Sequence, residues 1–460
     1  GDQGGIAEAD VEAMRTSGLA HLLSISGLHV GAVVAGTMLL MLRLLALSPT
    51  LALRAPLPMI AAGVAALVGI LYTLLAGAQI PTVRSCIAAL LILAALAMGR
   101  EAVTLRLVAA GAILVLLLWP EALVSPSFQL SFAAVTALVA FHDHPRVRAF
   151  AARREGEGWI GRGLRAVLIL LATGLAVEIA LVPIALYHFH RAGIHGVVAN
   201  MIAIPLTTFI IMPLEALALL MDVIGLGGLF WKISGISLNF LINIAHFVES
   251  QPGAVSALPA MPLAAFGLMV LAGLWFCLWR EMPRWLALPV FLAGALWAGL
   301  TSSPDLLVTS DGRHVAVRAN AGGLFLLRPG AGDFTRETLR TVAAETERGP
   351  LDVMPSARCS PDLCAADIES DGRRWRLLAT RSPYFVSWPA MVRACAEADI
   401  VVSDRRLPKG CVPRWLKVDR LLLARTGGLA IRFDPPEITT ARRARDDHPW
   451  MRVSPASYPR

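Results

Sequence analysis

The chain has 460 residues, of which 56% are hydrophobic and only 16% are charged, and its mean hydropathy is +0.64. Soluble globular proteins have roughly 25% charged residues, so this composition excludes a set of soluble domains and places most of the chain in lipid. Lys and Arg number 41 against 33 Asp and Glu, a formal net charge of +8. None of the lysines, Lys232, Lys409 and Lys417, follows a glycine, which excludes a Walker A nucleotide-binding loop.

Apolar stretches long enough to cross a bilayer dominate the first 300 residues. A span needs about 20 apolar residues to cross roughly 30 Å of hydrocarbon. On that measure the sequence predicts about ten spans, at residues 30–47, 57–76, 80–98, 103–119, 123–141, 166–187, 197–221, 224–247, 262–279 and 284–300. Pro205 and Pro213 predict a kinked or broken helix in the seventh span. The chain opens on Gly1 without a signal-like apolar segment, and we expect the natural protein to begin further upstream.

Arginine is distributed unevenly among the loops that join these spans. The links after the first, third, fifth and ninth spans carry arginines, whereas 120–127 and 248–261 contain no Lys or Arg and 188–196 contains only Arg191. Because short cytoplasmic loops collect Lys and Arg, this pattern predicts that both chain ends lie outside the cytoplasm. The stretch 224–247 is polar enough to be an interfacial helix instead. In that case the C-terminal domain would be cytoplasmic.

The character of the sequence changes at about residue 300. Residues 301–460 are richer in charge and predict a soluble α/β domain, with strands at 314–318 and 323–327 and helices at 335–346 and 389–398. This domain holds four of the six cysteines: Cys359, Cys364, Cys395 and Cys411. On the outer side of the membrane they fit two disulfides, of which Cys359–Cys364 with Cys395–Cys411 is the local pairing. The other pairings, free thiols and a zinc site stay open as alternatives.

Ionisable residues inside the apolar stretches need a physical reason, because a charge at membrane depth costs on the order of 2.5–3.5 kcal/mol on insertion scales. Arg84 precedes the apolar run Cys86–Met98, which is too short to span the bilayer unless the helix extends back through Arg84. Glu178 and Glu215 lie inside the stretches 166–187 and 197–221. One interpretation is a structural ion pair between Arg84 and one of these glutamates. The other is that Arg84 faces an aqueous path and meets passing anions.

Two further groups of polar residues invite a functional interpretation. The stretch 224–247 carries Lys232, Asn239, Asn243 and His246 on one helical face, which predicts either a pore lining or a contact with another helix. His188, His190 and His195 gather in one loop without an accompanying carboxylate. We interpret that loop as solvated rather than as a metal site.

The start of the first span is unusually polar. It reads His21-Leu-Leu-Ser24-Ile-Ser26-Gly27-Leu28-His29-Val-Gly31. Gly27 and Gly31 are four residues apart and allow close approach of a neighbouring helix. A Ser/His nucleophile is disfavoured because no carboxylate that could orient the histidine is near in the sequence.

Four blocks of sequence resemble the ComEC/Rec family of competence proteins, the inner-membrane channels for transforming DNA. The segment 18–30, with Ser26, Gly27, Leu28 and His29, is similar to the family's signature motif. In the expected order follow the blocks 77–85 with Arg84, 125–132 with its F-Q-L-S-F sequence, and 195–205 with its A-N-hydrophobic-P pattern. The resemblance covers roughly residues 1–300.

The resemblance also implies an N-terminal OB-like domain, which is absent from this sequence, and a C-terminal metallo-β-lactamase-like domain proposed to degrade one DNA strand. A dinuclear site of that fold needs a cluster of histidines and carboxylates. Beyond residue 300 the chain has only His314 and His448, and the segment 398–404 is interpreted as a relic of that fold. We therefore expect a degenerate, non-catalytic domain without metal or cofactor, and a chain that is not an enzyme.

The resemblance implies a multi-pass protein of the bacterial inner membrane, with a periplasmic C-terminal domain, that translocates single-stranded DNA into the cytoplasm during natural transformation. It also implies a periplasmic DNA receptor and a cytoplasmic helicase as partners. The residues expected to line the DNA path are Gln79, Arg84, Gln129, Ser131, Asn200, Lys232, Asn239 and Asn243. Two alternatives stay open: a secondary transporter of a small anion that uses Arg84 and Glu178, and a membrane scaffold with an exterior partner-binding domain.

Overall fold

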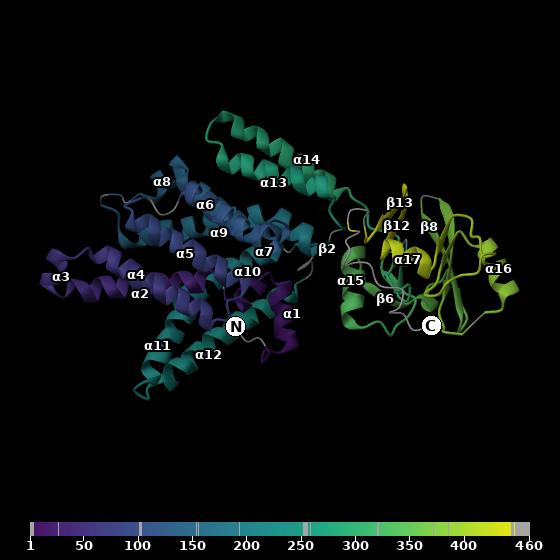
Figure 1. Ribbon diagram of the computed structural model, residues 1–460, viewed down its shortest axis with the longest axis horizontal. Coiled ribbons are helices and arrows are strands. Elements are labelled where there is room, and N and C mark those ends of the chain that lie inside the picture. Colours follow the sequence, from purple (N-terminus) through teal and green to yellow (C-terminus); the bar gives the residue numbers. More distant parts are fainter. Residues whose placement is uncertain are drawn as a thin grey trace. The chain divides into compact units, whose positions relative to one another are not determined.

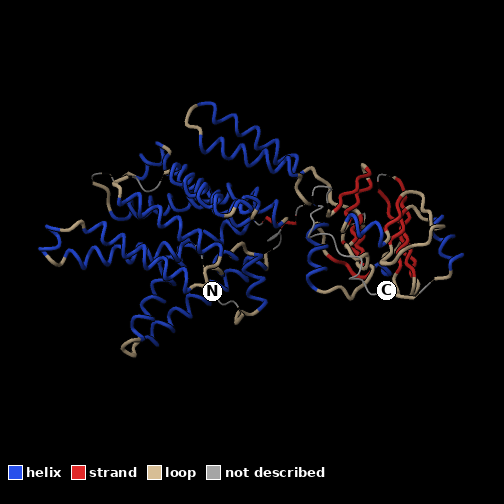
Figure 2. The backbone as a smooth tube through the Cα atoms, in the orientation of Figure 1, coloured by secondary structure: helices blue, strands red, loops and turns tan. Residues whose placement is uncertain are grey.

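The computed structural model describes residues 4–25, 27–100, 104–152, 154, 156–192, 194–251, 256–257, 259–319, 322–370, 372–384, 386–442 and 446. The chain divides into two compact units, Gly1–Ser256 with Pro262–Ala298 and Ala257–Met261 with Gly299–Arg460. The first unit is built from helices, and the second contains two sheets with flanking helices (Figure 1, Figure 2).

The helices of the first unit follow the predicted apolar stretches. Their bounds are α1 Glu8–Thr16, α2 Gly27–Ala46, α3 Pro49–Arg54, α4 Leu57–Leu75, α5 Ile80–Ala97, α6 Leu105–Leu118, α7 Pro126–Asp143, α8 Pro145–Ala151, α9 Trp159–Phe189, α10 Ile194–Leu206, α11 Met212–Asp222, α12 Gly227–Glu249, α13 Leu263–Leu278 and α14 Ala287–Gly299. Short 3-10 turns are η1 Ala20–Leu23, η2 Pro120–Val124 and η4 Met282–Leu286, and the two-residue strands are β1 Arg191–Ala192 and β2 Ser256–Ala257.

Within the described residues, six helices are long and apolar enough to cross a membrane: Gly27–Ala46, Leu57–Leu75, Ile80–Ala97, Trp159–Phe189, Val198–Asp222 and Gly227–Glu249. A polytopic helical membrane domain is therefore present. The predicted number of about ten spans is not confirmed. The other four predicted stretches form α6, α7, α13 and α14, which fall short of that length or hydropathy.

Small residues and one π-helical turn determine how these helices pack. A Cβ on Gly69 of α4 would lie 2.8 Å from Val34 Cγ2 of α2, so glycine permits their close approach. The π-helical turn η3, Thr207–Ile211, separates α10 from α11, with Pro205 before it and Pro213 after it. The kinked or broken helix predicted for the seventh span is thus a π-helical turn within one continuous helix, Val198–Asp222, at a place where each proline removes a backbone donor from the helical ladder.

The second unit is a sandwich of two sheets. One sheet has the order β13-β12-β3-β4-β5-β6 and the other the order β11-β10-β9-β8-β7. The strands are β3 Leu306–Val308, β4 Val315–Arg318, β5 Leu324–Leu326, β6 Glu347–Pro350, β7 Ala357–Cys359, β8 Leu363–Ser370, β9 Arg373–Thr380, β10 Ile400–Val402, β11 Leu416–Val418, β12 Leu429–Phe433 and β13 Pro436–Thr440. The helices are α15 Asp333–Ala343, α16 Trp388–Glu397 and α17 Arg420–Thr426, with a 3-10 turn η5 at Leu351–Val353.

Apolar residues of both sheets share one core, which contains Leu306 and Ile431 from the first sheet and Leu377 and Ile400 from the second. α15 packs on the other side of the first sheet, and α16 packs on the other side of the second. The unit is thus a layered α/β/β/α sandwich. The predicted strands at 314–318 and 323–327 and the predicted helices at 335–346 and 389–398 correspond to β4, β5, α15 and α16.

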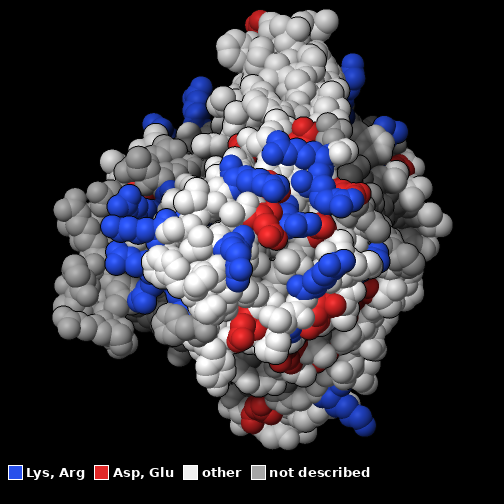
Figure 3. Space-filling view, turned by 90° about the vertical axis from the view of Figure 1, so that its right-hand side faces the viewer, with Lys and Arg blue, Asp and Glu red and all other residues white. Residues whose placement is uncertain are grey.

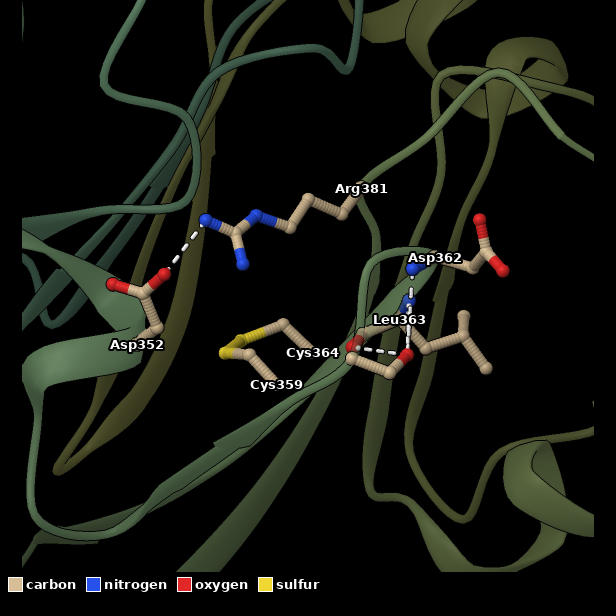
Figure 4. The surroundings of a disulfide bond; sticks show 7 residues. Asp352, Cys359, Asp362, Leu363, Cys364 and Arg381 are labelled. Carbon is tan, nitrogen blue, oxygen red and sulfur yellow. Dashed lines mark hydrogen bonds and ion pairs between the residues drawn. A yellow bond between two sulfur atoms is a disulfide. The ribbon is translucent and has the colours of Figure 1, made fainter.

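Two disulfides tie the second unit together. Cys359 and Cys364 face each other in the β7–β8 register and are bonded, and Cys395 of α16 is bonded to Cys411 in the loop after β10. Figure 4 shows the first bond beside the ion pair between Arg381 and Asp352, whose Nη2 and Oδ2 atoms are 2.7 Å apart. This is the local pairing among the alternatives that the sequence left open.

Candidate functional site

The four sequence blocks that resemble the competence family meet in the first unit. Their residues lie at or next to the N-terminal ends of α2, α5, α7 and α10. Side-chain hydrogen bonds and close backbone contacts connect these helix ends. We call this group the signature cluster: residues 17–25, 27–29, 80–85, 123–129 and 196–200, together with Glu178 and His188. The chain connections between these segments are long, so the contacts are tertiary.

Arg84 joins α5 to the start of α7. Its side chain is 7% exposed, and its Nη2 donates to Ser127 O at 3.1 Å and to Ser127 Oγ at 2.5 Å. Nε and Nη1 are buried and have no hydrogen-bond partner. The suggested ion pair with Glu178 or Glu215 is therefore wrong, because the guanidinium binds neutral oxygens at a helix start. A buried cation with free donors is the kind of group that binds an anion.

α2 and α5 approach each other closely where their helices begin. A Cβ on Gly27 would lie 3.3 Å from Ser85 Oγ, and Thr82 Oγ1 donates to Ile25 O at 3.4 Å. Gly77, with φ +84°, lets the chain turn from α4 into α5. Gly27, Leu28 and the half-buried His29 form the first turn of α2, and Ser26 lies outside the described residues.

Gln129 links the start of α7 to the end of α9. Its Oε1 accepts a hydrogen bond from His188 Nε2 at 2.9 Å, and its Nε2 donates to Leu123 O at 2.9 Å. The amide is thereby held in one orientation. His188 belongs to the loop whose histidines suggested a solvated or metal-binding group, and in the structure it serves as a hydrogen-bond partner of the F-Q-L-S-F block.

The fourth block packs against the first. A Cβ on Gly196 of α10 would lie 3.3 Å from Ser17 O and 3.8 Å from Gly18 Cα, so α10 meets the turn between α1 and η1 at backbone distance. One turn further along α10, Asn200 lies beside the Glu178 carboxylate of α9. Asn200 Oδ1 is buried without a partner. The cluster therefore contains an unpaired acceptor as well as the unpaired donors of Arg84.

The helix starts and Arg84 give the signature cluster a positive potential, which the carboxylate of Glu178 partly opposes. Each α-helix start carries partial positive charge, equivalent to roughly half an elementary charge, on its unpaired N–H groups, and four such starts contribute residues here. His21, in η1 before the first span, adds no fixed charge: burial lowers its pKa, and the hydrogen bond to Gly18 O only partly opposes this. At neutral pH the cation of the cluster is Arg84.

Comparison with known proteins agrees with the sequence blocks. Residues 1–283 match the model of the family described as Competence protein. The chain belongs to the competence protein family. No solved structure matches it significantly.

Three relatives are similar in sequence to part of this competence family member. The chain is 29% identical over 353 residues to Competence protein ComA of Neisseria gonorrhoeae, 75% of this chain and 46% of that protein. It is 28% identical over 215 residues to ComE operon protein 3 of Bacillus subtilis, 46% of this chain and 24% of that protein. It is 29% identical over 301 residues to Uncharacterized protein YcaI of Escherichia coli, 57% of this chain and 37% of that protein. The chain thus spans less than half the length of each of these relatives.

Other predicted path residues lie apart from these contacts. Gln79, at the start of α5, and Ser131, in α7, are exposed. Lys232, Asn239 and Asn243 are exposed on α12, on the face opposite to the one that packs against the bundle through residues such as Leu241. The structure does not bring this stripe to Arg84.

The remaining polar residues have local surroundings of their own. His246 Nε2 lies 2.8 Å from Asp10 Oδ1 of α1. The polar face of α12 therefore contacts α1 near the C-terminal end of the helix. Glu215 of α11 lies near Tyr72 of α4. In the part of the chain that the structure describes, no group of three or more His, Cys, Asp or Glu residues is arranged to hold a metal ion.

Sequence reasoning missed Ser127 and His188 as members of the cluster. Ser127 lies inside a block that was singled out for Gln129 and Ser131, and its role appears only once α5 and α7 are placed together. A usable signal was available: each block begins a helix from a loop poor in Lys and Arg, a pattern that predicts the same side of the membrane for all of them.

Proposed function

We propose that this chain forms the channel through which single-stranded DNA crosses the bacterial inner membrane into the cytoplasm during natural transformation. The observation that carries the proposal is the signature cluster, with the buried, partly unpaired guanidinium of Arg84 among four helix starts. A polyanion cannot cross roughly 30 Å of hydrocarbon unshielded. Hydrogen-bond donors at the entrance of a hydrated path would replace part of the water that solvates each phosphate.

The chemistry of the cluster suits transient rather than tight binding. One arginine supplies two free donors, and Gln129, Ser127 and Asn200 add neutral polar groups. A passage must bind its cargo strongly enough to admit it and weakly enough to release it. Many fixed cations would hold the strand, whereas a single buried cation, with neutral groups and the Glu178 carboxylate around it, lets successive phosphates replace one another.

We further propose that the second unit is a periplasmic, non-catalytic relative of the metallo-β-lactamase fold. Its layered sandwich supports this, and so do the carboxyl ends of β9 and β10. There Asp404 lies 3.4 Å from Arg328 Nη2, and Thr380 Oγ1 donates to Ser403 Oγ at 3.0 Å. The carboxylate thus faces an arginine, and the domain's histidines, His314 and His448, are too few for a dinuclear cluster. The residues present do not fit such a metal centre.

The partners follow from the direction of transport. A periplasmic receptor would deliver DNA to the outer face, and a cytoplasmic helicase would pull the emerging strand, because the chain has no Walker A loop of its own. Two disulfides in the second unit support its location in an oxidising compartment.

The proposal is tested with the purified chain in liposomes that contain a helicase and ATP. End-labelled single-stranded oligonucleotide is added outside, and protection of the label from external nuclease is measured. We expect protection above that of protein-free vesicles, and its loss in Arg84→Ala. Equal protection with and without the protein would overturn the proposal.

The two alternatives predict different results in the same vesicles. A small-anion transporter would move a radiolabelled inorganic anion under a proton gradient and would lose this activity in Glu178→Gln as well as in Arg84→Ala. A scaffold would move neither cargo and would tolerate both substitutions.

A further inference from the structure

We propose that the second unit binds single-stranded DNA by base stacking on an aromatic platform formed by Tyr384 and Trp388. This inference rests on the proposed function and adds a DNA site outside the membrane domain. Tyr384 is 73% exposed and Trp388 is 60% exposed. They lie four residues apart, in the loop after β9 and at the first residue of α16.

The loop that carries the platform is held in place. Arg405 Nη1 donates to Pro383 O and to Tyr384 O, both at 2.9 Å, and its Nη2 donates to Ser382 O at 2.9 Å. Val386 packs into the apolar cluster beneath α16. Three charge-assisted hydrogen bonds to consecutive carbonyls and a partly buried anchor hold the backbone, which lowers the cost of ordering this loop on binding.

The surroundings of the platform are basic. Over residues 381–417 there are seven Lys and Arg against three Asp and Glu. Arg406 and Lys409 are exposed in the loop that the Cys395–Cys411 disulfide attaches to α16. Figure 3 views the molecule from the side on which α16 lies in Figure 1, and Lys and Arg side chains are spread over this face among acidic ones.

Aromatic rings beside cations match the chemistry of a single strand. Each base offers a π face to an exposed ring, and each phosphate offers a charge to Arg or Lys. A bilayer surface is the competing occupant for such residues, but it calls for a continuous apolar face. Among the described residues 380–415, Val412 is the only large aliphatic side chain that is strongly exposed. The composition therefore favours unpaired bases over lipid.

Binding is measured with the full chain in detergent, by the fluorescence anisotropy of a labelled oligothymidylate. We expect Tyr384→Ala and Trp388→Ala each to weaken binding by about five-fold or more, because stacking of one base on one ring accounts for that much. Tyr384→Phe and Trp388→Phe keep the rings and should keep the affinity. Phe334→Ala is the matched control, since Phe334 is 86% exposed on α15, across the sandwich from α16.

An abasic strand of the same length separates stacking from charge, and we expect it to bind the wild type and both alanine variants equally weakly. Wild-type affinity in both alanine variants, or an equal loss with the abasic strand, would overturn the inference. So would quenching of Trp388 fluorescence by brominated lipid in nanodiscs, absent in Trp388→Phe, because it would place the platform in the bilayer. Failure here leaves the vesicle result with Arg84→Ala untouched, so the two proposals fail separately.

Discussion

Replacing Arg84 by alanine should abolish DNA uptake while leaving the fold nearly as stable as the wild type. The substitution removes two hydrogen bonds to Ser127, each stabilising by about 1.5–3 kcal/mol because the donor is charged. It also removes a buried cation whose two unpartnered nitrogens, Nε and Nη1, carry three N–H bonds. A charge at membrane depth costs on the order of 2.5–3.5 kcal/mol. The two contributions nearly offset each other, so the free energy of unfolding should change by only about 1–2 kcal/mol.

Uptake should respond very differently, since the free donors are the groups proposed to receive phosphates. The assay is protection of labelled oligonucleotide in liposomes, together with binding measured across a series of salt concentrations. For a single strand, each lost phosphate contact should reduce the slope of log affinity against log salt by about 0.7. Arg43→Ala, which removes an exposed arginine at the last turn of α2, is the control. Wild-type uptake and an unchanged slope in a folded Arg84→Ala protein would refute this reasoning.

Three further predictions concern stability. Gly196→Ala should lower the free energy of unfolding in detergent by about 1–3 kcal/mol, because the new methyl group meets Ser17 O. Gly163→Ala is the control and should not destabilise the protein, since no atom lies within 4 Å of the new methyl group. Equal melting temperatures in the two variants would contradict the prediction. Removing the Cys395–Cys411 disulfide, whose sequence separation is 16, by the double substitution Cys395→Ala and Cys411→Ala should destabilise the second unit by about 3 kcal/mol, seen as a lower melting temperature under non-reducing conditions. Desolvation raises the pKa of Asp311, but hydrogen bonds from Thr309 and the Arg313 N–H outweigh desolvation and hold this pKa below its ordinary value of 3.8. The ionised Asp311 therefore stabilises the fold at neutral pH, and this contribution is lost in acid as the pH falls below 3.8. Asp311→Asn should flatten this part of the acid-unfolding curve.

The helical framework was predictable because it depends on local composition. Long apolar runs must form helices in lipid, since backbone groups there have no water to bind, and this identified α2, α4, α5 and α9 correctly. The number of spans was less predictable. α6 and α14 are short helices whose apolar flanks extend into turns, so a count of apolar residues overestimates their helical length.

The members of the candidate site were only partly predictable, because their contacts are tertiary. Arg84 was identified from its depth in an apolar run, but its partner Ser127 is 43 residues away and comes from another helix. For α12, helical periodicity predicted a polar face correctly. Periodicity alone does not say which face packs, and the packing against α1 and α10 leaves Lys232 and Asn239 exposed.

The central claim, that DNA passes the signature cluster, is tested most directly by photo-crosslinking during uptake. A benzophenone side chain is placed either at Gln129, in the cluster, or at Asn239, on the exposed face of α12, and a labelled strand is stalled in transit by a bulky 3′ group. Crosslinks at position 129 and their absence at position 239 are the predicted result. Crosslinks at position 239 alone would contradict the claim and place the strand on another path.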